Sequence, residues 1–417
     1  MAGKGNPSHG AGRRRFLARG LAAGALALAT PHRQGSALAP VWPPGDRAAG
    51  TPIPETTVIL ADFGGRPGAD RLALAAAFRD GLAALARAGG GTLLVPPGTY
   101  DFGAFDQPES ILLCRDLRDI AISAYGAVFA ANTARLVVPH MFYFHNFNNV
   151  TLAGATFVDH GFFPWVDWKG MYCVGIQADR SSSGLRLVDC RAERVLGLLA
   201  SNNGAAGRHL LSDIHVQGEV SHAYYGVGAS HIGGGVSVDL DCHNVRRAFI
   251  AHAARRADVV VRTSADRAWP GSNGLVALVC QGARLGDVEH VRVRIDVSGD
   301  CIHDSYVHFY HQGPQAEGAM RDIDATVNVL ATQSMGTMFL FDHEIHGIQP
   351  RTARQWERIS LHGSLAAGST GRVIANPSVS TAGGTVYLDR NLAGLAGAMP
   401  DRFRIAPESS ASIPCDC

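Results

Sequence analysis

The chain has 417 residues, of which 46% are hydrophobic, 18% are charged and 7% are aromatic, and it holds 49 glycines. This composition excludes a small disulfide scaffold and a disordered chain, and the length suffices for one large repetitive domain or two ordinary ones. Residues 1–39 contain six basic residues and no acidic ones. The rest of the chain contains 31 basic and 36 acidic residues, a net charge of −5. A mildly acidic remainder argues against nucleic acid as a partner.

The basic N-terminus has the order of an export signal. Gly12-Arg13-Arg14-Arg15-Phe16-Leu17 resembles the twin-arginine motif, an apolar stretch covers 21–29, and Ala37-Leu38-Ala39 matches a small-x-small cleavage site. We therefore expect 1–39 to be a twin-arginine signal peptide, 40–56 to be a leader, and the protein to be periplasmic or secreted. No apolar run reaches the roughly 18 residues that a membrane-spanning helix needs, so no membrane span is expected.

The next segment predicts a strand, an amphipathic helix and a second strand. Residues 58–63 are mostly apolar and end at two glycines. Residues 69–88 carry apolar side chains at helical spacing, and three glycines at 89–91 end the helix. A short strand at 92–95 and a turn at 96–100 follow.

Three motifs of this segment carry a resemblance to a known superfamily. Asp62-Phe63-Gly64, Gly89-Gly90-Gly91 and Pro96-Pro97-Gly98-Thr99-Tyr100 resemble the N-terminal segment of pectate-lyase-like and polygalacturonase-like proteins, although Ala69-Asp70-Arg71 replaces their Asp-Asp-Thr. The resemblance implies an all-β fold, a right-handed parallel β-helix (a solenoid) with an N-terminal capping α-helix. We expect the cap to span 57–110, the β-helix 111–400 and a C-terminal tail 401–417.

The residues after the cap predict the same fold from their own pattern. Pieces of the form apolar-x-apolar, from Ile120-Ala121-Ile122 to Val386-Tyr387-Leu388, begin 22 to 36 residues apart. One coil of this length cannot bury its inner face alone, so successive coils must stack. A sandwich of short strands would instead need a turn every 8–12 residues or so.

A second apolar strand in each coil ends in a polar residue. If the coils stack in register, these residues form one column with neighbours about 4.8 Å apart, along a linear polar groove suited to an extended polysaccharide. The predicted column contains His145, Asp179, Ser201, Ser230, His252, Gln281, Tyr310, Asp342 and Asn376.

The segment 299–311 is the densest in titratable groups. With Val307 and Phe309 inward, strand alternation places Asp304, Tyr306, His308 and Tyr310 outward. Gly299-Asp300-Cys301-Ile302 resembles the Gly-Asp-Asp-Cys motif of polygalacturonases, with one of the two aspartates absent. Candidate catalytic residues are Asp300, Asp304, His308, Tyr310, Asp342 and Glu344. Candidate substrate-binding residues are His252, Gln281, Tyr306, His311, His343, Tyr224, Tyr225, Trp168 and Lys169.

Three functions follow from these residue types. A hydrolase would cleave glycosidic bonds of a polysaccharide with two of the acids. A lyase or C5-epimerase for a uronate polymer would use Tyr or His as the base. It would also need a cation, for which the candidates are Arg246, Arg247, Arg255, Arg256 and Lys169. A non-catalytic β-helix would only bind a glycan.

The abundance of acids favours the hydrolase. Two acids at the spacing of an inverting enzyme would support hydrolysis, and a Tyr/His pair beside an arginine would support elimination. No cofactor or metal site is predicted, with Ca²⁺ as an assistant only in the lyase case. Six cysteines lie singly in apolar runs and are expected to be small buried hydrophobic residues: Cys114, Cys173, Cys190, Cys242, Cys280 and Cys301.

Overall fold

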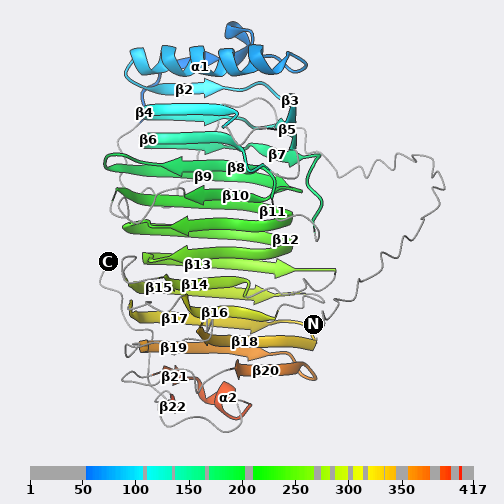
Figure 1. The fold of residues 1–417 in the computed structure, drawn as a ribbon, viewed down its shortest axis with the longest axis vertical. Helices are drawn as coiled ribbons and strands as arrows, with labels where there is room; N and C mark the ends of the chain where they lie inside the picture. Colours follow the sequence, from blue (N-terminus) through cyan, green and yellow to red (C-terminus); the bar gives the residue numbers. More distant parts are fainter. Residues whose placement is uncertain are drawn as a thin grey trace, which may run out of the picture. The chain divides into compact units, whose positions relative to one another are not determined.

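The structure, a computed structural model, is a parallel β-helix, as the sequence predicts. It describes residues 53–106, 110–133, 137–164, 169–201, 210–266, 274–281, 287–298, 304–312, 318–332, 334–343, 356–375, 386–395 and 403–405. These residues form 22 strands and two α-helices, and each strand pairs in parallel with strands of the neighbouring coils (Figure 1). They all belong to the compact unit Ala49–Cys417, and the predicted signal peptide lies outside them.

Three series of strands run along the stack, and the long strands belong to more than one series. Series 1 contains β1 (Thr57–Ile59), β2 (Gly91–Leu94), β4 (Leu112–Ser123), β6 (His140–Ala153), β9 (Ser182–Glu193), β11 (Leu211–Ser230), β12 (Gly234–His252), β13 (Arg255–Ser264), β15 (Val288–Val297), β17 (Met320–Val329), β19 (Trp356–Leu365), β21 (Val386–Leu388) and β22 (Phe403–Ile405). Series 2 contains β8 (Tyr172–Gln177), β10 (Gly197–Ser201), β14 (Val276–Gln281), β16 (Ser305–Gln312), β18 (Ser334–His343) and β20 (Thr370–Ala375), together with the first residues of β4 and β6 and the last residues of β11 and β12. Series 3 contains β3 (Gly98–Phe105), β5 (Ala127–Thr133) and β7 (Thr156–Asp159) and continues into the end of β9.

The helix α1 (Arg71–Arg87) lies over β2 and β4 at one end of the series (Figure 1). It begins at Asp70, whose carboxylate accepts hydrogen bonds from the N–H groups of Leu72 and Ala73 at 2.9 and 3.0 Å. Its buried face meets the strands through Phe78, whose ring centroid lies 5.6 Å from that of Phe142. A 3₁₀ helix (Leu60–Phe63) replaces the second half of the strand expected at 58–63, and α2 (Arg390–Ala393) is a single turn. No helix of the described residues is long and apolar enough to cross a membrane.

The series 2 strands bend at a fixed place, and this bend decides which side chains face outward. A regular strand alternates inward and outward side chains. Here two consecutive residues are fully buried in several coils, as at Met141–Phe142, Cys173–Val174, Tyr306–Val307 and Met338–Phe339. The outward positions are therefore the residue before this pair and the first and third residues after it. The described cysteines, Cys114, Cys173, Cys190, Cys242 and Cys280, are all buried, as expected.

A column of residues with left-handed backbone lies within the strands, near the start of their series 1 segments. One residue per coil has φ between 51° and 74° in nine successive coils. Asn, Asp and Gly tolerate this conformation best, and they hold six of the nine positions. The column contains Asp119, Asn149, Gly184, Asp213, Gly235, Arg256, His290, Asp322 and Arg358. Amide and carboxylate groups also bond along it, as in the 2.7 Å bond from Asn149 Nδ2 to Asp119 Oδ1.

Candidate functional site

The outward side of series 2 carries three columns of residues, which we call the site face. The first column contains His140, Tyr172, Gly197, Tyr225 and Arg247. The middle column contains Tyr143, Gly175, Ala200, Gly228, Ile250, Ala277, His308 and Leu340. The third column contains His145 and Gln177 and, further along the series, Ser230, His252, Val279, Tyr310 and the register position of Asp342.

Stacked rings form the start of the first column. The centroids of His140 and Tyr172 lie 5.7 Å apart with ring planes 14° apart, and those of Tyr172 and Tyr225 lie 6.2 Å apart at 20°. The coil between the two tyrosines contributes Gly197, where a Cβ atom would lie 2.6 Å from Cε1 of Tyr172. The absence of a side chain at Gly197 therefore allows the rings to stack across it, and the middle column beside them is small at Gly175, Ala200 and Gly228.

Arg247 continues the first column and lies between two tyrosines. Burial lowers the pKa of Arg247, and the neighbouring Tyr225 and Tyr310 oppose this by favouring the charged guanidinium. Burial likewise raises the pKa of Tyr225, while the Arg247 charge acts in the other direction. The Nε of Arg247 donates to the carbonyl oxygen of Gly274 at 3.4 Å. The guanidinium thus extends from β12 across the next coil toward the residues of β16.

His308 and Tyr310 reach the same place from β16. Their rings stack with centroids 4.8 Å apart and planes 24° apart. His308 is 1% exposed although it points away from the core, whereas Tyr310 is half-buried. Gly274 has φ +92°, and a Cβ atom there would lie 2.5 Å from Cβ of His308. Because Gly274 and Ala277 of the β14 coil are small, side chains of the β12 coil and the β16 coil can approach each other across it.

His252 is the neighbouring titratable group in the third column. Its Nδ1 lies 2.9 Å from Oγ of Ser230, one coil earlier. Burial, helped by the charges of His231 and Arg247, lowers the pKa of His252 to about 4. The imidazole is therefore neutral at pH 7 and is available to accept a proton or a hydrogen bond.

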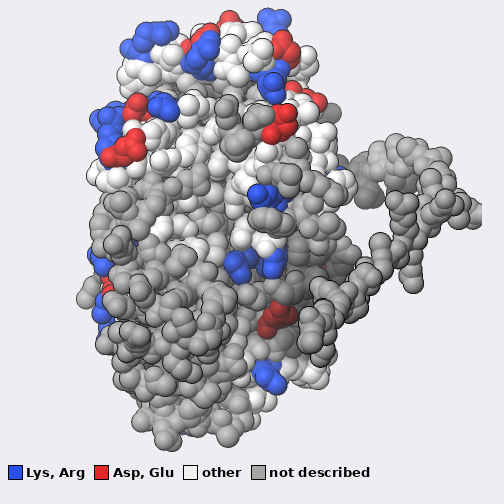
Figure 2. All heavy atoms as spheres, viewed as in Figure 1, with Lys and Arg blue, Asp and Glu red and all other residues white. Residues whose placement is uncertain are grey.

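Several arginines on other faces pair with acids. Arg262 contacts Asp239 and Asp241, and Arg321 contacts Asp287 and Glu289. Arg255, a candidate cation, pairs with Glu289 at 3.1 Å. Figure 2 shows basic and acidic side chains interspersed over the described residues of the viewed face. Arg246 and Arg247 differ because they lie beside tyrosines: the Cζ of Arg246 is 4.3 Å from the ring centroid of Tyr224.

Two predicted substrate-binding residues lie in the interior instead of on the surface. Tyr306 and His311 are both 0% exposed. Tyr306 is the first residue of the buried pair at the bend, so the alternation that was expected to turn it outward is broken there. His311 continues the inward run of Val307 and Phe309, and its ring packs 5.4 Å from that of Trp356.

The register also corrects three members of the predicted column. Ser201 pairs with the buried Ile176 and so stands one position before the third column. Gln281 pairs with Gln312, and Val279 takes its expected place between His252 and Tyr310. Gln177, not Asp179, pairs with His145, although the Asp179 carboxylate reaches Nε2 of His145 at 2.9 Å. His252, Tyr310 and Asp342 do share one register position in their coils.

The remaining candidates fall into those that lie outside the described residues and those that the structure describes. Asp300, Glu344 and Trp168 lie outside the described residues, as do the side chains of Gln281, Asp342 and His343. Asp304 is exposed, and its charge raises the pKa of Arg246 against the lowering effect of burial. Lys169 is half-buried at the end of the loop before β8. Tyr224 and Tyr225 touch each other with centroids 4.6 Å apart.

His140 and Tyr172 are site-face residues that the sequence patterns did not identify. A signal for them exists: each directly precedes two apolar residues that open a series 2 strand, as Tyr225 and Arg247 precede such a pair in later coils. In the sequence alone this position resembles the last residue of a turn. The bend makes it an outward member of the same sheet.

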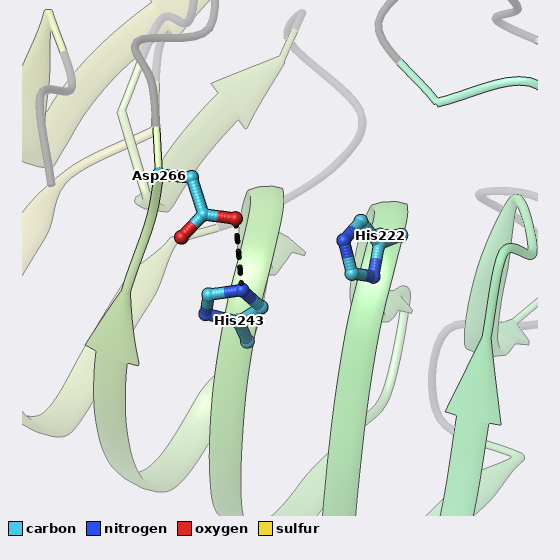
Figure 3. A group of neighbouring side chains, drawn as sticks. All are labelled: His222, His243 and Asp266. Carbon is cyan, nitrogen blue, oxygen red and sulfur yellow. Dashed lines mark ion pairs between the residues drawn. The ribbon is translucent and has the colours of Figure 1, made fainter. Parts of the chain in front are cut away.

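A second cluster lies at a corner next to the site face. His222 on β11, His243 on β12 and Asp266 after β13 come from successive coils, and Figure 3 shows their side chains gathered together. One ligand atom from each lies within 4.8 Å of the others, and no second group of this kind occurs among the described residues. Asn244 Nδ2 lies 3.2 Å from His222 Nε2, 3.0 Å from His243 Nε2 and 3.0 Å from Asp266 Oδ2.

Comparisons with known proteins give only distant similarities. No protein-family model matches the sequence, and neither does any curated protein. Among solved structures, the A-module of the Azotobacter vinelandii mannuronan C-5 epimerase AlgE6 is 16% identical with a TM-score of 0.37, covering 79% of this chain and 93% of that one.

Two further solved structures are similar at the same level. The tailspike protein of E. coli bacteriophage HK620, solved with a hexasaccharide, is 13% identical with a TM-score of 0.30, covering 82% of this chain and 77% of that one. The Streptococcus pneumoniae surface protein and adhesin PfbA is 11% identical with a TM-score of 0.29, covering 76% and 99%. The assignment of the fold to this chain rests on its own strand register.

Proposed function

We propose that this chain acts on a uronate-containing polysaccharide as a lyase or C5-epimerase, removing the proton from the carbon that bears the carboxylate. The observation that carries the proposal is the convergence of Arg247 with Tyr225 on one side and the His308–Tyr310 stack on the other. Of the expected hydrolytic acids, the side chain that the structure describes is that of Asp304, which is exposed and lies beside Arg246.

The chemistry needs the two groups that this site brings together. The C5 proton of a uronate is weakly acidic, and a cation bound to the carboxylate stabilises the negative charge that develops when the proton leaves. Arg247 has that role, because a guanidinium can hold a carboxylate through two parallel N–H bonds. Tyr310 is the group that takes the C5 proton, at a surface position within reach of a sugar bound over Arg247.

The two reactions share this first step and differ in the second. In the lyase the electron pair of the broken C5–H bond forms a C4–C5 double bond, the C4–O bond breaks and the leaving oxygen takes a proton. In the epimerase the same carbon is protonated again from its opposite face. Tyr225 lies on the other side of Arg247 from Tyr310, which is the arrangement that a second proton donor requires.

The remainder of the site face suits binding of neighbouring sugars. The stacked rings of His140, Tyr172 and Tyr225 offer apolar faces, and the small residues of the middle column leave the backbone close to a bound chain. The Tyr143 hydroxyl donates to Oε1 of Gln177, so both amide and hydroxyl groups are present for sugar hydroxyls.

Product analysis tests the reaction. The mature chain is incubated with uronate polymers in D₂O, with and without Ca²⁺, and followed by near-ultraviolet absorbance, by deuterium at C5 and by new reducing ends. A lyase gives absorbance, an epimerase gives deuterium without new ends, and reducing ends without absorbance establish the hydrolase instead.

Arg247→Gln is expected to lower kcat/KM at least about 100-fold, with Arg191→Gln, which loses only an exposed pair with Glu219, as the matched control. Polymer binding without any of these products would leave the glycan-binding function in place of the enzyme.

We also propose that the protein is exported through its twin-arginine segment. The support is the order of Arg13-Arg14, the apolar stretch and Ala37-Leu38-Ala39. In cell fractionation, Arg13→Lys together with Arg14→Lys is expected to retain the chain in the cytoplasm. Export that persists in this double variant contradicts the proposal.

A further inference from the structure

We infer that His222, His243 and Asp266 form a binding site for one divalent transition-metal ion, with Zn²⁺ the best fit. Two imidazole nitrogens and one carboxylate oxygen are the donor set that such ions prefer, and hard oxygen-seeking ions such as Ca²⁺ are poorly served by it. The three residues are contributed by β11, β12 and the segment directly after β13, so the stacking of the coils brings them together (Figure 3).

The spacing of the donor atoms supports a tetrahedral ion. Bonds of about 2.05 Å at tetrahedral angles place neighbouring ligand atoms about 3.3 Å apart. His243 Nε2 and Asp266 Oδ2 are 3.4 Å apart, so this edge of the tetrahedron already has the required length. The remaining atoms of the group lie within 4.8 Å, and a shift of up to about 1.5 Å in the His222 ring closes the site.

The Asn244 amide nitrogen lies at the fourth corner of the group. It is 3.0 to 3.2 Å from all three donor atoms, close to the spacing between neighbouring ligands of a tetrahedral ion, so it occupies the place of a fourth ligand. Its orientation is set from the other side, because Asn244 Oδ1 accepts the N–H of Asp266 at 2.9 Å. An amide has two hydrogens, and three acceptor atoms face it, so the amide serves this cluster less well than a cation would.

A further contact prepares one histidine for a metal. His243 Nδ1 lies 2.9 Å from Oγ of Ser264. A histidine that binds metal through Nε2 carries its proton on Nδ1 and donates it to such an oxygen, which holds the ring in place. We therefore expect Oγ of Ser264 to accept the Nδ1 proton of His243 while Nε2 binds the metal.

A metal here would also tie together the coils of the site face. His222 and His243 stand three and four residues before Tyr225 and Arg247. A bound ion would link β11, β12 and the segment directly after β13 at the corner that leads into these two residues. The inference is independent of the proposed reaction, because its test measures binding of the metal alone.

The test is a titration of the chelator-treated mature chain with Zn²⁺ alone, by isothermal calorimetry at neutral pH. We expect one tight equivalent per chain and a raised Tm. His222→Asn and His243→Asn are expected to weaken this equivalent at least about 100-fold, and Ser264→Ala about tenfold. Asn suits the left-handed backbone of His222 (φ 51°). The matched control is His290→Asn, since His290 has the same backbone (φ 56°) and an acidic neighbour, Asp322 at 3.9 Å, but no second histidine.

Asn244→Asp makes the test independent of simple loss of folding. The change keeps the shape of the side chain and replaces the N–H donor with an oxygen that serves as the fourth ligand. Without metal this variant is expected to melt below the wild type, and with Zn²⁺ to gain more in Tm than the wild type does. The inference is overturned if the wild type binds no Zn²⁺ at about 100 μM, or if His222→Asn and His243→Asn bind it as His290→Asn does.

Discussion

The ring of His308 stacks on the ring of Tyr310, with centroids 4.8 Å apart. The two residues are consecutive outward positions of β16, and a stack of this kind contributes about 1 kcal/mol beyond burial. Because His308 is almost fully buried, it holds the ring of the half-buried Tyr310 in one orientation. A substitution that keeps the stacked ring of Tyr310 and removes its hydroxyl therefore tests the hydroxyl alone.

Tyr310→Phe is the first prediction. The phenyl ring keeps the stack but loses the proton-transferring hydroxyl, so kcat on a uronate polymer should fall about 10²- to 10⁴-fold with KM nearly unchanged. Steady-state kinetics measure both. Tyr387→Phe, on β21 of series 1, is the control and should behave as wild type. An unchanged kcat in Tyr310→Phe would exclude this residue as the base.

Gly274→Ala should damage the site more than an ordinary glycine substitution. The added Cβ would lie 2.5 Å from Cβ of His308, and the positive φ adds about 1–2 kcal/mol of backbone strain. We expect a lower Tm and a loss of activity from displacement of His308. In Gly235→Ala, φ is also positive (+55°) but the nearest atoms are 3.7 Å away, so it isolates the backbone cost. Equal losses of activity in the two variants would contradict the role given to Gly274.

Stability should fall as the pH is lowered from about 6.5 to 4. Burial lowers the pKa of both His140 and His252 to about 4, below the 6.5 of an unfolded histidine. The unfolded chain therefore binds more protons in this window, and the free energy of unfolding decreases by about 2 kcal/mol per histidine between pH 7 and 5. Urea unfolding at the two pH values measures the loss. His252→Gln should remove about half of that loss, and a loss as large as in the wild type would refute its share.

Asp159 should be essential for stability. Its buried carboxylate accepts the backbone N–H groups of Thr133, Gly161 and Met171 at 2.9, 3.0 and 3.1 Å. Asp159→Ala leaves three backbone donors without this acceptor and should cost about 3–5 kcal/mol of unfolding free energy. Denaturant unfolding gives the value. Asp101→Ala, which removes an exposed carboxylate from the N–H of Gly103, should cost less than about 1 kcal/mol, and similar costs for both would argue against a special role of Asp159.

Part of the candidate site could be predicted from the sequence because strand alternation is a local property. Val307 and Phe309 lie inward and His308 and Tyr310 outward, as their alternation requires. Tyr306 does not follow this alternation, because packing of the coils against one another produces the bend that buries it. The His222–His243–Asp266 group could not be predicted from the sequence for another reason. Its members stand 21 and 23 residues apart, which is not a recognised metal-ligand spacing.

The sequence by itself determined the fold, since the apolar repeats every 22 to 36 residues have a buried inner face only when the coils stack. It also determined which coils are rich in titratable groups. Only the tertiary structure decided that Arg247, 63 residues before Tyr310, lies near it, and that Val279 replaces Gln281 in the column of Tyr310. The physical reason is that the outer turns vary in length, so counting residues does not identify neighbours. The hydrogen-bond register between parallel strands does.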